Sequence, residues 1–583
     1  MENAKGKRIM SFTAPVAEQI LALRANARID ALVDDPDMVS AIVEGIGAFA
    51  ASEWAPLNRI GDCEGARLGD GKVMLPKGFA AAYRAYVDAG WNGIAAPEEF
   101  GGQGLPFSLG IAAMESLGSA NLAFSLLPML TMGAIAALRH HGTADQQARY
   151  LPRLVSGEWS GTMNLTEPQA GSDVGALGTR ATPISEGPDA GLYRIAGTKI
   201  FITWGEHELT DNIVHLVLAR IAGAPPGSRG ISLFVVPRFR IEADGSTGAR
   251  NDVKAVGLEH KLGIHASPTC VMSYGDKGEC IGELVGGENE GLAAMFTMMN
   301  HARINVGAQG VEIAERALQQ AHAYARERVQ SARAGSRHRT PVAIVEHPDV
   351  RRMLLRMRAL TEGARALLYY ACGQVDRGAL GDAAAWMRAD LLVPLVKAWC
   401  TEVGVEVASL NIQVHGGMGY IEETGAAQLY RDARIPPIYE GTNGIQAADL
   451  VTRKLALESG GVLTGLMDEI AADTGAWPAL RELATACTDT GQWMIEAAGI
   501  DDRLAGSMPF LTMCAVATAG WQLLAQARAA AEDPEVPAAI AARKPVVARY
   551  FLEHLVPEAL GLHAAAHAGS SLLYQLDADG LTE

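Results

Sequence analysis

The chain has 583 residues and a net charge of −17, with 49% hydrophobic and 20% charged residues. At roughly 100–200 residues per domain, this length predicts several domains of ordinary globular composition. The acidic balance disfavours nucleic acid and anionic lipid as partners, and no apolar run reaches the roughly 18–20 residues of a membrane helix. We therefore expect a cytoplasmic, bacterial protein without a membrane span.

The first part of the chain, residues 1–160, has the pattern of an α-helical domain. Apolar residues recur at helical spacing in residues 39–49 and 79–87. A break rich in Gly and Pro covers residues 97–106, and helical character returns over residues 111–138. Pro128 predicts a kink or a join within this last segment.

The sequence pattern changes over residues 161–285, where short runs typical of β-strands alternate with turns. These runs are residues 193–203, 213–219, 230–236 and 269–274, and they are separated by Pro-Gly and Asp-Gly pairs. The pattern predicts a mainly antiparallel β domain. No Gly-x-Gly-x-x-Gly follows a strand, so a dinucleotide would have to bind in another way than in a Rossmann fold.

Two further helical regions follow the β domain. Residues 286–460 contain long helices at 350–370 and 383–410, and the second is expected to end at Gly416-Gly417. Residues 461–583 are Ala-rich, with breaks expected at Pro478, Pro509 and Asp533-Pro534. This tail has 6 Lys and Arg against 16 Asp and Glu, which argues against nucleic-acid binding. The sequence thus predicts a multidomain α+β fold with the domains 1–160, 161–285, 286–460 and 461–583.

The segment 435–443, Ile-Pro-Pro-Ile-Tyr-Glu-Gly-Thr-Asn, is a candidate catalytic loop. Two prolines before Glu440 and a glycine after it would fix the loop, and loops on rigid scaffolds often carry catalytic groups. Its apolar neighbours would desolvate Glu440, raise the pKa of its carboxyl and make it a better base near neutral pH. The alternative is a Glu that caps the following helix or pairs with an Arg.

A second candidate is the segment 165–173, Leu-Thr-Glu-Pro-Gln-Ala-Gly-Ser-Asp. A tight loop of this composition can present backbone N–H groups to an anion or to a heteroaromatic edge. Taken alone, the segment is better explained as a plain turn.

Together the two segments resemble the acyl-CoA dehydrogenase family, and the similarity extends over residues 163–173, 197–205, 300–328 and 413–446, and more weakly over 40–160. The resemblance implies an N-terminal helical domain, a central β domain and a C-terminal helical bundle. It is closest to long members that add a further helical domain, among them the 3-methylmercaptopropionyl-CoA dehydrogenases. Segments 204–207, 265–270 and 346–350 carry that closer similarity.

The resemblance also assigns roles to individual residues. Glu440 matches the catalytic base and Arg303 the active-site arginine. The residues that match FAD contacts of the family are Thr166, Ser172, Phe201, Thr203, Arg328, Gln413, Gly416, Gly417, Thr442 and Asn443. Arg328, Gln413, Gly416 and Gly417 would reach the FAD of a neighbouring subunit. No metal site is expected, because the His residues lack the spacing of metal ligands.

Two aromatic residues depart from the family pattern. Phe201 stands where the family usually has a Trp packed on the flavin, so its contact there would be apolar only. Trp204 stands where many members have a small or polar residue, and it would either shorten the acyl pocket or pack on the surface. The seven Cys are scattered without a Cys-x-x-Cys motif, so we expect reduced thiols, each buried as a small apolar residue.

The function implied by the resemblance is FAD-dependent α,β-dehydrogenation of an acyl-CoA to the trans-2-enoyl-CoA. The substrate would be 3-methylmercaptopropionyl-CoA or a short- to medium-chain acyl-CoA, the acceptor an electron-transfer flavoprotein, and the assembly a homodimer. Three alternatives stay open: an acyl-CoA oxidase that uses O₂, a flavin-bearing nucleic-acid binder, and a catalytically silent flavoprotein binding module. The acidic tail and the Glu at the base position disfavour the nucleic-acid binder.

Overall fold

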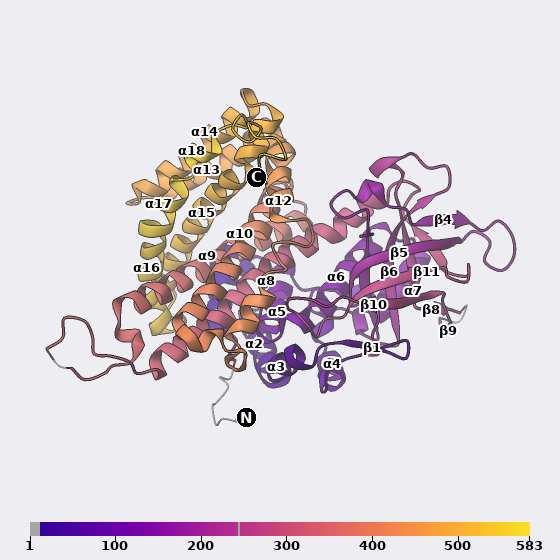
Figure 1. The fold of residues 1–583 in the computed structure, drawn as a ribbon, viewed down its shortest axis with the longest axis horizontal. Coiled ribbons are helices and arrows are strands. Elements are labelled where there is room, and N and C mark those ends of the chain that lie inside the picture. The colour runs from indigo at the N-terminus through magenta and orange to yellow at the C-terminus, as the bar shows by residue number, and fades with distance from the viewer. Residues whose placement is uncertain (1–11, 243–244, 338, 583) are drawn as a thin grey trace. The chain divides into compact units, whose positions relative to one another are not determined.

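The computed structural model describes residues 12–242, 245–337 and 339–582, which divide into two compact units (Figure 1). The β unit comprises residues 49–105 and 120–302. The helical unit comprises the residues up to 48, residues 106–119 and the residues from 303 onward. The order of helical, β and helical segments confirms the predicted multidomain α+β fold.

An eight-stranded sheet forms the centre of the β unit, in the order β10-β11-β5-β12-β7-β6-β3, with β4 beside β5 and β6. Most neighbours are antiparallel, as predicted, but β3 and β4 both run parallel to β6. Two small hairpins, β1–β2 and β8–β9, complete the strands described (Figure 1). The strands are β1 (Arg67–Gly69), β2 (Lys72–Met74), β3 (Trp159–Asn164), β4 (Arg180–Pro183), β5 (Tyr193–Thr203), β6 (Asn212–Ile221), β7 (Ser232–Pro237), β8 (Phe239–Ile241), β9 (Thr247–Arg250), β10 (Val253–Leu258), β11 (Thr269–Tyr274) and β12 (Ile281–Val285).

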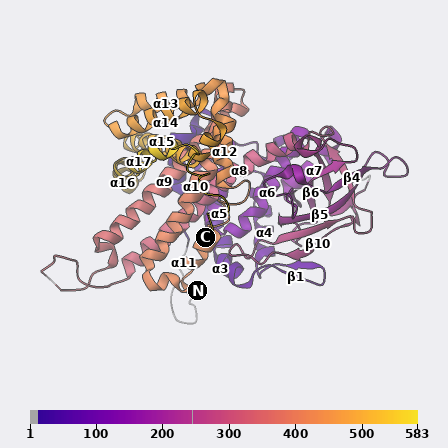
Figure 2. The same ribbon diagram turned by 45° about the horizontal axis from the view of Figure 1, so that its top comes forward.

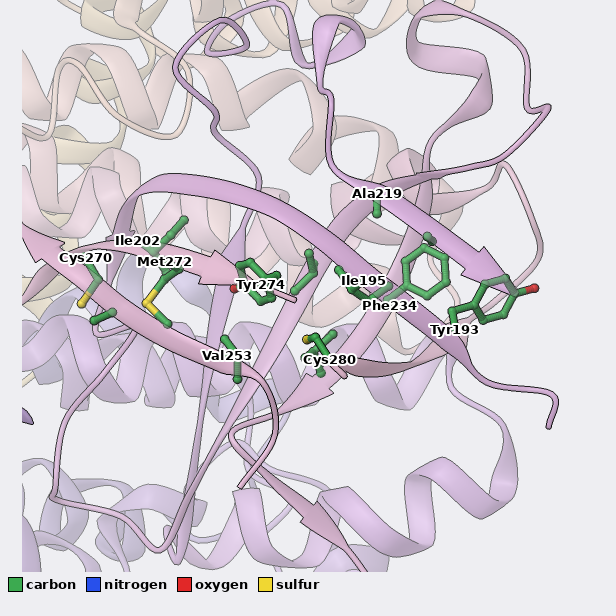
Figure 3. Packing of buried hydrophobic residues seen from close by; sticks show 14 of the residues in the cluster. Tyr193, Ile195, Ile202, Ala219, Phe234, Val253, Cys270, Met272, Tyr274 and Cys280 are labelled. Carbon is green, nitrogen blue, oxygen red and sulfur yellow. The ribbon is translucent and has the colours of Figure 1, made fainter. Parts of the chain in front are cut away.

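An apolar core covers one face of this sheet, as Figure 3 shows. Alternate residues of β5, among them Tyr193 and Ile195, point into it, as expected of a strand with one buried face. Tyr193 meets Phe234 of β7 edge to face, with ring centroids 5.0 Å apart. Burial of each large apolar side chain stabilises the fold by roughly 1.5–3 kcal/mol, and the core includes Ile202, at the end of β5 that carries candidate site residues.

The helices of the β unit include α6 (Leu122–His141), which runs unbroken through Pro128. The predicted join at Pro128 is therefore wrong, because the join lies at Asn121, whose side chain accepts a hydrogen bond from Phe124 N–H at 3.2 Å. A break at Pro128 would have left further backbone groups unpaired in the interior. The other helices of this unit are α3 (Ala55–Glu64), α4 (Phe79–Asp88) and α7 (Ala144–Ser156).

Long helices make up the helical unit, and α9 and α10 pack side by side along their length (Figure 2). The predicted breaks at Pro478 and Asp533 are confirmed, but α15 continues through Pro509, because packing of this long buried helix outweighs one lost hydrogen bond. The helices are α1 (Val16–Ala22), α2 (Pro36–Phe49), α5 (Phe107–Ala120), α8 (Gly291–Glu327, which joins this unit at residue 303), α9 (Pro348–Ala379), α10 (Ala383–His415), α11 (Ala426–Asp432), α12 (Asn443–Thr452), α13 (Gly461–Asp473), α14 (Pro478–Glu496), α15 (Ile500–Glu532), α16 (Ala538–Tyr550), α17 (Val556–Leu560) and α18 (His563–Ala566).

A buried ionic cluster ties the last helices of the chain to the rest of the helical unit. Lys544 of α16 is buried, and its ammonium lies 2.6 Å from a carboxylate oxygen of Glu18 in α1 and 2.9 Å from one of Glu362 in α9. It also donates to the side chain of Gln526 in α15, at 2.6 Å. Loss of one partner from such a cluster costs about 3–5 kcal/mol, because the remaining charge stays buried.

Two helices, α6 and α15, have the length and apolar composition of membrane spans, but 89% and 72% of their most apolar windows are buried inside the fold. Burial of this extent is typical of core helices. The Cys residues are free thiols; six are buried as predicted, whereas Cys63 is exposed. Among the described residues, no group of three or more His, Cys, Asp or Glu could hold a metal ion.

Candidate active site

Glu440 lies in a tight irregular segment between α11 and α12. Two backbone hydrogen bonds close the segment, from Ile438 N–H to Ile435 O at 2.8 Å and from Asn443 N–H to Pro437 O at 2.9 Å. Glu440 has a left-handed φ of 57°, which is uncommon for a residue other than Gly. Gly441 follows with a φ of 86°, and a Cβ there would lie 2.9 Å from the side-chain nitrogen of Gln446. The turn is thus held in a conformation that its surroundings must impose.

Helices α8 and α12 hold this turn. Arg303 of α8 donates from Nε to Glu440 O at 3.4 Å, so the structure brings the two predicted catalytic residues together. Gln446 of α12 donates to the carbonyl oxygens of Glu440 and Gly441, each at 3.4 Å. Tyr439 donates its hydroxyl to the side-chain oxygen of Gln309 in α8. The backbone of the turn is therefore anchored on both sides of the Glu440 carboxyl.

The electrostatic surroundings suit Glu440 to act as a base. Burial raises the pKa of its carboxyl, while Arg303 and Lys397 oppose that rise. Among the described residues, none accepts a hydrogen bond from Glu440 N–H. The turn thus offers a carboxylate that can take a proton and, beside it, an N–H that can bind a developing oxyanion.

The two residues after the turn differ in where they lie. Thr442 is exposed and caps α12, with its hydroxyl accepting a hydrogen bond from Ile445 N–H at 3.2 Å. Asn443 is buried, and its side-chain amide is bound to α10, where it accepts from Lys397 Nζ at 2.9 Å and donates to Glu402 at 2.7 Å. A cofactor contact of Asn443 stays a prediction, and what the structure adds is a direct link from this residue to α10.

In the β unit, the candidate loop at residues 165–173 lies beside β5, because Ile200 N–H donates to Thr166 O at 2.9 Å. The next residue, Glu167, is buried and binds Lys199 Nζ at 2.8 Å and the N–H groups of Gly178 and Thr179 at 2.6 and 3.0 Å. Burial would raise the pKa of the Glu167 carboxyl, but Lys199 and these hydrogen bonds hold it at about 2. This pairing fixes the backbone next to Thr166.

The end of β5 carries an exposed aromatic ring between buried neighbours. Phe201 is 57% exposed, whereas Ile202 and Trp204 are buried. Phe201 and Trp204 both have left-handed φ angles, of 60° and 53°, on either side of the half-buried Thr203. Trp204 stacks on Phe124 with ring centroids 6.0 Å apart and donates its indole N–H to Ala123 O at 3.3 Å. The alternative in which Trp204 packs on the surface is therefore wrong.

The remaining predicted cofactor residues are exposed to solvent. Ser172 is exposed in the β unit, and Arg328 is exposed just after α8, where it donates to the side chain of Gln330 at 3.0 Å. Gln413 is exposed in the last turn of α10, which ends at Gly416 as predicted. A Cβ at Gly416 or Gly417 would meet nothing within 4 Å, so this backbone is open to the approach of a ligand.

These features fit the chemistry of FAD. An exposed apolar ring on the strand that carries Thr203 and is paired with the Thr166 backbone matches a flavin, which has an apolar face and a polar edge. Phe201 and Trp204 have left-handed φ angles, a kind of backbone strain that persists where the surroundings impose it, as at ligand sites. An exposed guanidinium such as that of Arg328 and open glycine backbone suit phosphate oxygens.

Five residues of the two regions were not found by sequence reasoning: Gln309, Lys397, Gln446, Glu167 and Lys199. For Lys397 a signal was present, because it is the one charged residue in the apolar run Leu391–Cys400. For Gln309, Glu167 and Lys199 the signal is tertiary, since each acts through a partner far away in the sequence, whereas Gln446 lies only six residues after Glu440.

A cavity of about 790 Å³ in the helical unit contains none of the predicted site residues. Its wall carries ion pairs such as Arg388–Glu469 and Arg528–Asp473, both at short distance. Because these charges are paired with one another, the cavity has the character of a solvated crevice and is separate from the candidate catalytic turn.

Four family models match successive parts of the chain. They describe the acyl-CoA dehydrogenase N-terminal domain (residues 39–158), middle domain (162–276) and C-terminal domain (289–455), and an acetyl-CoA dehydrogenase C-terminal-like domain (464–577). Together they cover most of the chain in the order that the sequence predicted.

Individual relatives agree with these models. The 3-methylmercaptopropionyl-CoA dehydrogenase of Ruegeria pomeroyi is 49% identical, covering 89% of this chain and 92% of the relative. A broad-specificity linear acyl-CoA dehydrogenase of Mycobacterium tuberculosis is 34% identical, covering 83% and 84%. The fold matches that of Caenorhabditis elegans ACDH-11 in complex with C11-CoA, with a TM-score of 0.77 at 21% identity, covering 95% and 94%. A structure described as the electron transferring flavoprotein of Acidaminococcus fermentans has a TM-score of 0.58 at 27% identity, covering 72% and 97%. This chain belongs to the acyl-CoA dehydrogenase family, and is an FAD-dependent oxidoreductase that acts on acyl-CoA thioesters.

Proposed function

We propose that the chain oxidises 3-methylmercaptopropionyl-CoA, or an acyl-CoA of similar short length, with Glu440 as the catalytic base. The substrate proposal is supported by the 49% identity to the Ruegeria pomeroyi enzyme, which extends over 92% of that protein. The assignment of Glu440 is carried by one observation, the strained turn that holds a carboxyl of raised pKa beside a backbone N–H without an acceptor among the described residues.

Glu440 takes the α-proton of the thioester onto its carboxylate. The thioester oxygen gains negative charge as the proton leaves, and Glu440 N–H stabilises that charge, an effect worth roughly 10²–10³ in rate for one such donor. FAD, when bound, supplies the acceptor for the β-hydrogen, which leaves as hydride. The remaining electrons form the trans-2,3 double bond, so the substrate loses one proton and one hydride.

The side chains around the turn set its geometry. Arg303 holds the carbonyl oxygen of Glu440 and contributes positive charge, which favours the ionised carboxylate. Phe201, Thr166 and Thr203 would hold the flavin, with Ser172, Arg328, Gln413, Gly416, Gly417 and Thr442 toward the rest of FAD. For Asn443, positioning of the turn is the role that its hydrogen bonds support.

The test is an anaerobic titration of the purified flavoprotein with acyl-CoAs from propanoyl to palmitoyl, including 3-methylthiopropanoyl-CoA, followed by flavin absorbance. Bleaching by 3-methylthiopropanoyl-CoA and short chains, with weaker bleaching by palmitoyl-CoA, is the expected result. Absence of bleaching with every thioester would contradict the dehydrogenase function. Rapid peroxide formation in air would instead favour an oxidase.

We also propose that the enzyme is a cytoplasmic homodimer of four domains, 1–160, 161–285, 286–460 and 461–583, which passes electrons to an electron-transfer flavoprotein. The four family matches support the domain division, since they end near these boundaries. Sedimentation equilibrium tests the dimer, and reduction of a purified electron-transfer flavoprotein by the substrate-reduced enzyme tests the acceptor.

A further inference from the structure

Lys397 is a buried cation without a carboxylate partner. It lies in the middle of α10, and its side chain is fully buried. Among the described residues, no carboxylate lies within 4.0 Å of Nζ, whose hydrogen-bond partner is the neutral side chain of Asn443 at 2.9 Å. A charge in the interior without an ionic partner is costly, so its presence calls for a reason other than stability.

Asn443 connects this lysine to the catalytic turn. Its side-chain nitrogen donates to Glu402 at 2.7 Å and to Thr401 at 3.1 Å, while its own N–H donates to Pro437 O at 2.9 Å. The Asn443 side chain therefore anchors one end of the Glu440 turn to α10. Lys397 adds to this link by donating a hydrogen bond to the side-chain oxygen of Asn443.

Three charged groups act on Lys397, from the Glu440 turn, α8 and α10 itself. Burial lowers the pKa of its ammonium to about 7, while Glu440 of the turn opposes this, Arg303 of α8 adds to it and Glu402 of α10 opposes it. In return, Arg303 and then Lys397 counteract the rise in the pKa of Glu440 that burial causes. Lys397 and Glu440 therefore stabilise each other's charged form across the interior.

We propose that Lys397 is a positioning residue for the catalytic base, which fixes the Glu440 turn through Asn443 and whose ammonium favours the ionised carboxylate. The inference rests on the proposed role of Glu440 and deepens it. It makes two separable claims: the link through Asn443 sets the geometry of the turn, and the charge of Lys397 sets the pH at which Glu440 becomes active.

The test compares the pH dependence of flavin reduction by substrate, under anaerobic conditions, in the full-length flavoprotein and three variants. In K397M the acid limb of the profile should move to higher pH by about one unit, because a nearby opposite charge is lost. The limb should keep its position in K397R, which retains the charge. Lys544→Met is the matched control: it removes another buried lysine of the same unit, whose partners are Glu18, Glu362 and Gln526. It should lower the Tm without moving the limb.

A second measurement does not depend on turnover. A lysine with a pKa of about 7 in the folded chain and 10.5 in the unfolded chain binds fewer protons when folded, so its contribution to stability grows as pH rises between these values. The Tm of wild type relative to K397M should therefore rise between pH 7 and pH 9. Should K397M not yield a folded flavoprotein, K397Q carries the same two predictions.

The outcomes separate this inference from the function on which it rests. If Glu440→Gln abolishes flavin reduction while K397M leaves both the acid limb and the pH trend of Tm unchanged, the role of Lys397 is overturned and that of Glu440 stands. If Glu440→Gln reduces flavin at the wild-type rate, the base assignment itself fails.

Discussion

Lys199 in the β unit and Lys397 in the helical unit are both fully buried, yet their ammonium groups contact different partners. Lys199 lies 2.8 Å from the Glu167 carboxylate, beside the loop that carries Thr166. Lys397 binds a neutral amide, and the carboxylate that responds to its charge is Glu440. Burial lowers the pKa of both lysines, to about 8 and about 7.

The difference shows how a buried cation can serve either structure or chemistry. Lys199 and Glu167 neutralise each other locally, so their pairing stiffens the loop and leaves little field beyond it. Lys397 has no such local partner, so its charge acts on the group that needs to stay ionised. We expect substitutions in the first region to change stability and cofactor retention, and those in the second to change rate and pH dependence.

The largest effect is expected for Glu440→Gln. The variant keeps the size of the side chain but cannot accept the α-proton, so flavin reduction should slow by about 10²–10⁴ while FAD stays bound. Anaerobic stopped-flow measurement of flavin bleaching checks this. The exposed Glu423→Gln, on the connection between α10 and α11 of the same unit, is the control, with an unchanged rate expected.

Next in size is Glu167→Gln, which leaves Lys199 buried without its carboxylate. The free energy of unfolding should fall by about 3–5 kcal/mol, with weaker retention of FAD. Urea unfolding followed by tryptophan fluorescence measures the change. Glu158→Gln removes a partly exposed partner of Arg153 in the same unit and should cost at most about 1 kcal/mol. Equal losses in the two variants would remove the distinction drawn for Glu167.

The Glu167 carboxyl is expected to cause part of the acid sensitivity of the β unit. The pKa of Glu167 is about 2 in the fold and 4.5 unfolded, so its contribution is complete above pH 4.5 and disappears as pH falls toward 2. Unfolding of the full chain between pH 5 and pH 3 should therefore be steeper in wild type than in Glu167→Gln. Parallel curves for the two proteins would contradict the assigned pairing.

A smaller effect is expected for Gly441→Ala in the catalytic turn. Its φ of 86° and the nearby Gln446 nitrogen disfavour a Cβ, so the free energy of unfolding should fall by about 1–2 kcal/mol and flavin reduction should slow. Gly444→Ala, in the first turn of α12, makes only ordinary contact and should be neutral or slightly stabilising. Calorimetry and stopped-flow measurement together distinguish the two.

Much of the fold could be predicted from the local pattern of the sequence. Strands β5 and β11 were predicted residue for residue, and the end of α10 at Gly416 followed from the glycines there. No helix ends at Pro128 or Pro509, because the packing of a buried helix can outweigh one lost backbone hydrogen bond. For Trp204, the sequence could not distinguish an interior from a surface position, which depends on the distant Phe124.

The sequence by itself determined the order of helical and β segments, the family, and Glu440 as the candidate base, because these depend on residues that are neighbours along the chain. Only the tertiary structure decided that Arg303, Gln309 and Gln446 fix the turn, that Glu167 pairs with Lys199, and that Lys397 stands without a carboxylate. Charges act across space, between residues that are far apart along the chain. Glu167 and Lys199 are separated by 32 residues, and Arg303 and Glu440 by 137. Local sequence pattern does not show which distant residues come close in the fold. The charges that act on Glu440 could therefore be identified only in the folded chain.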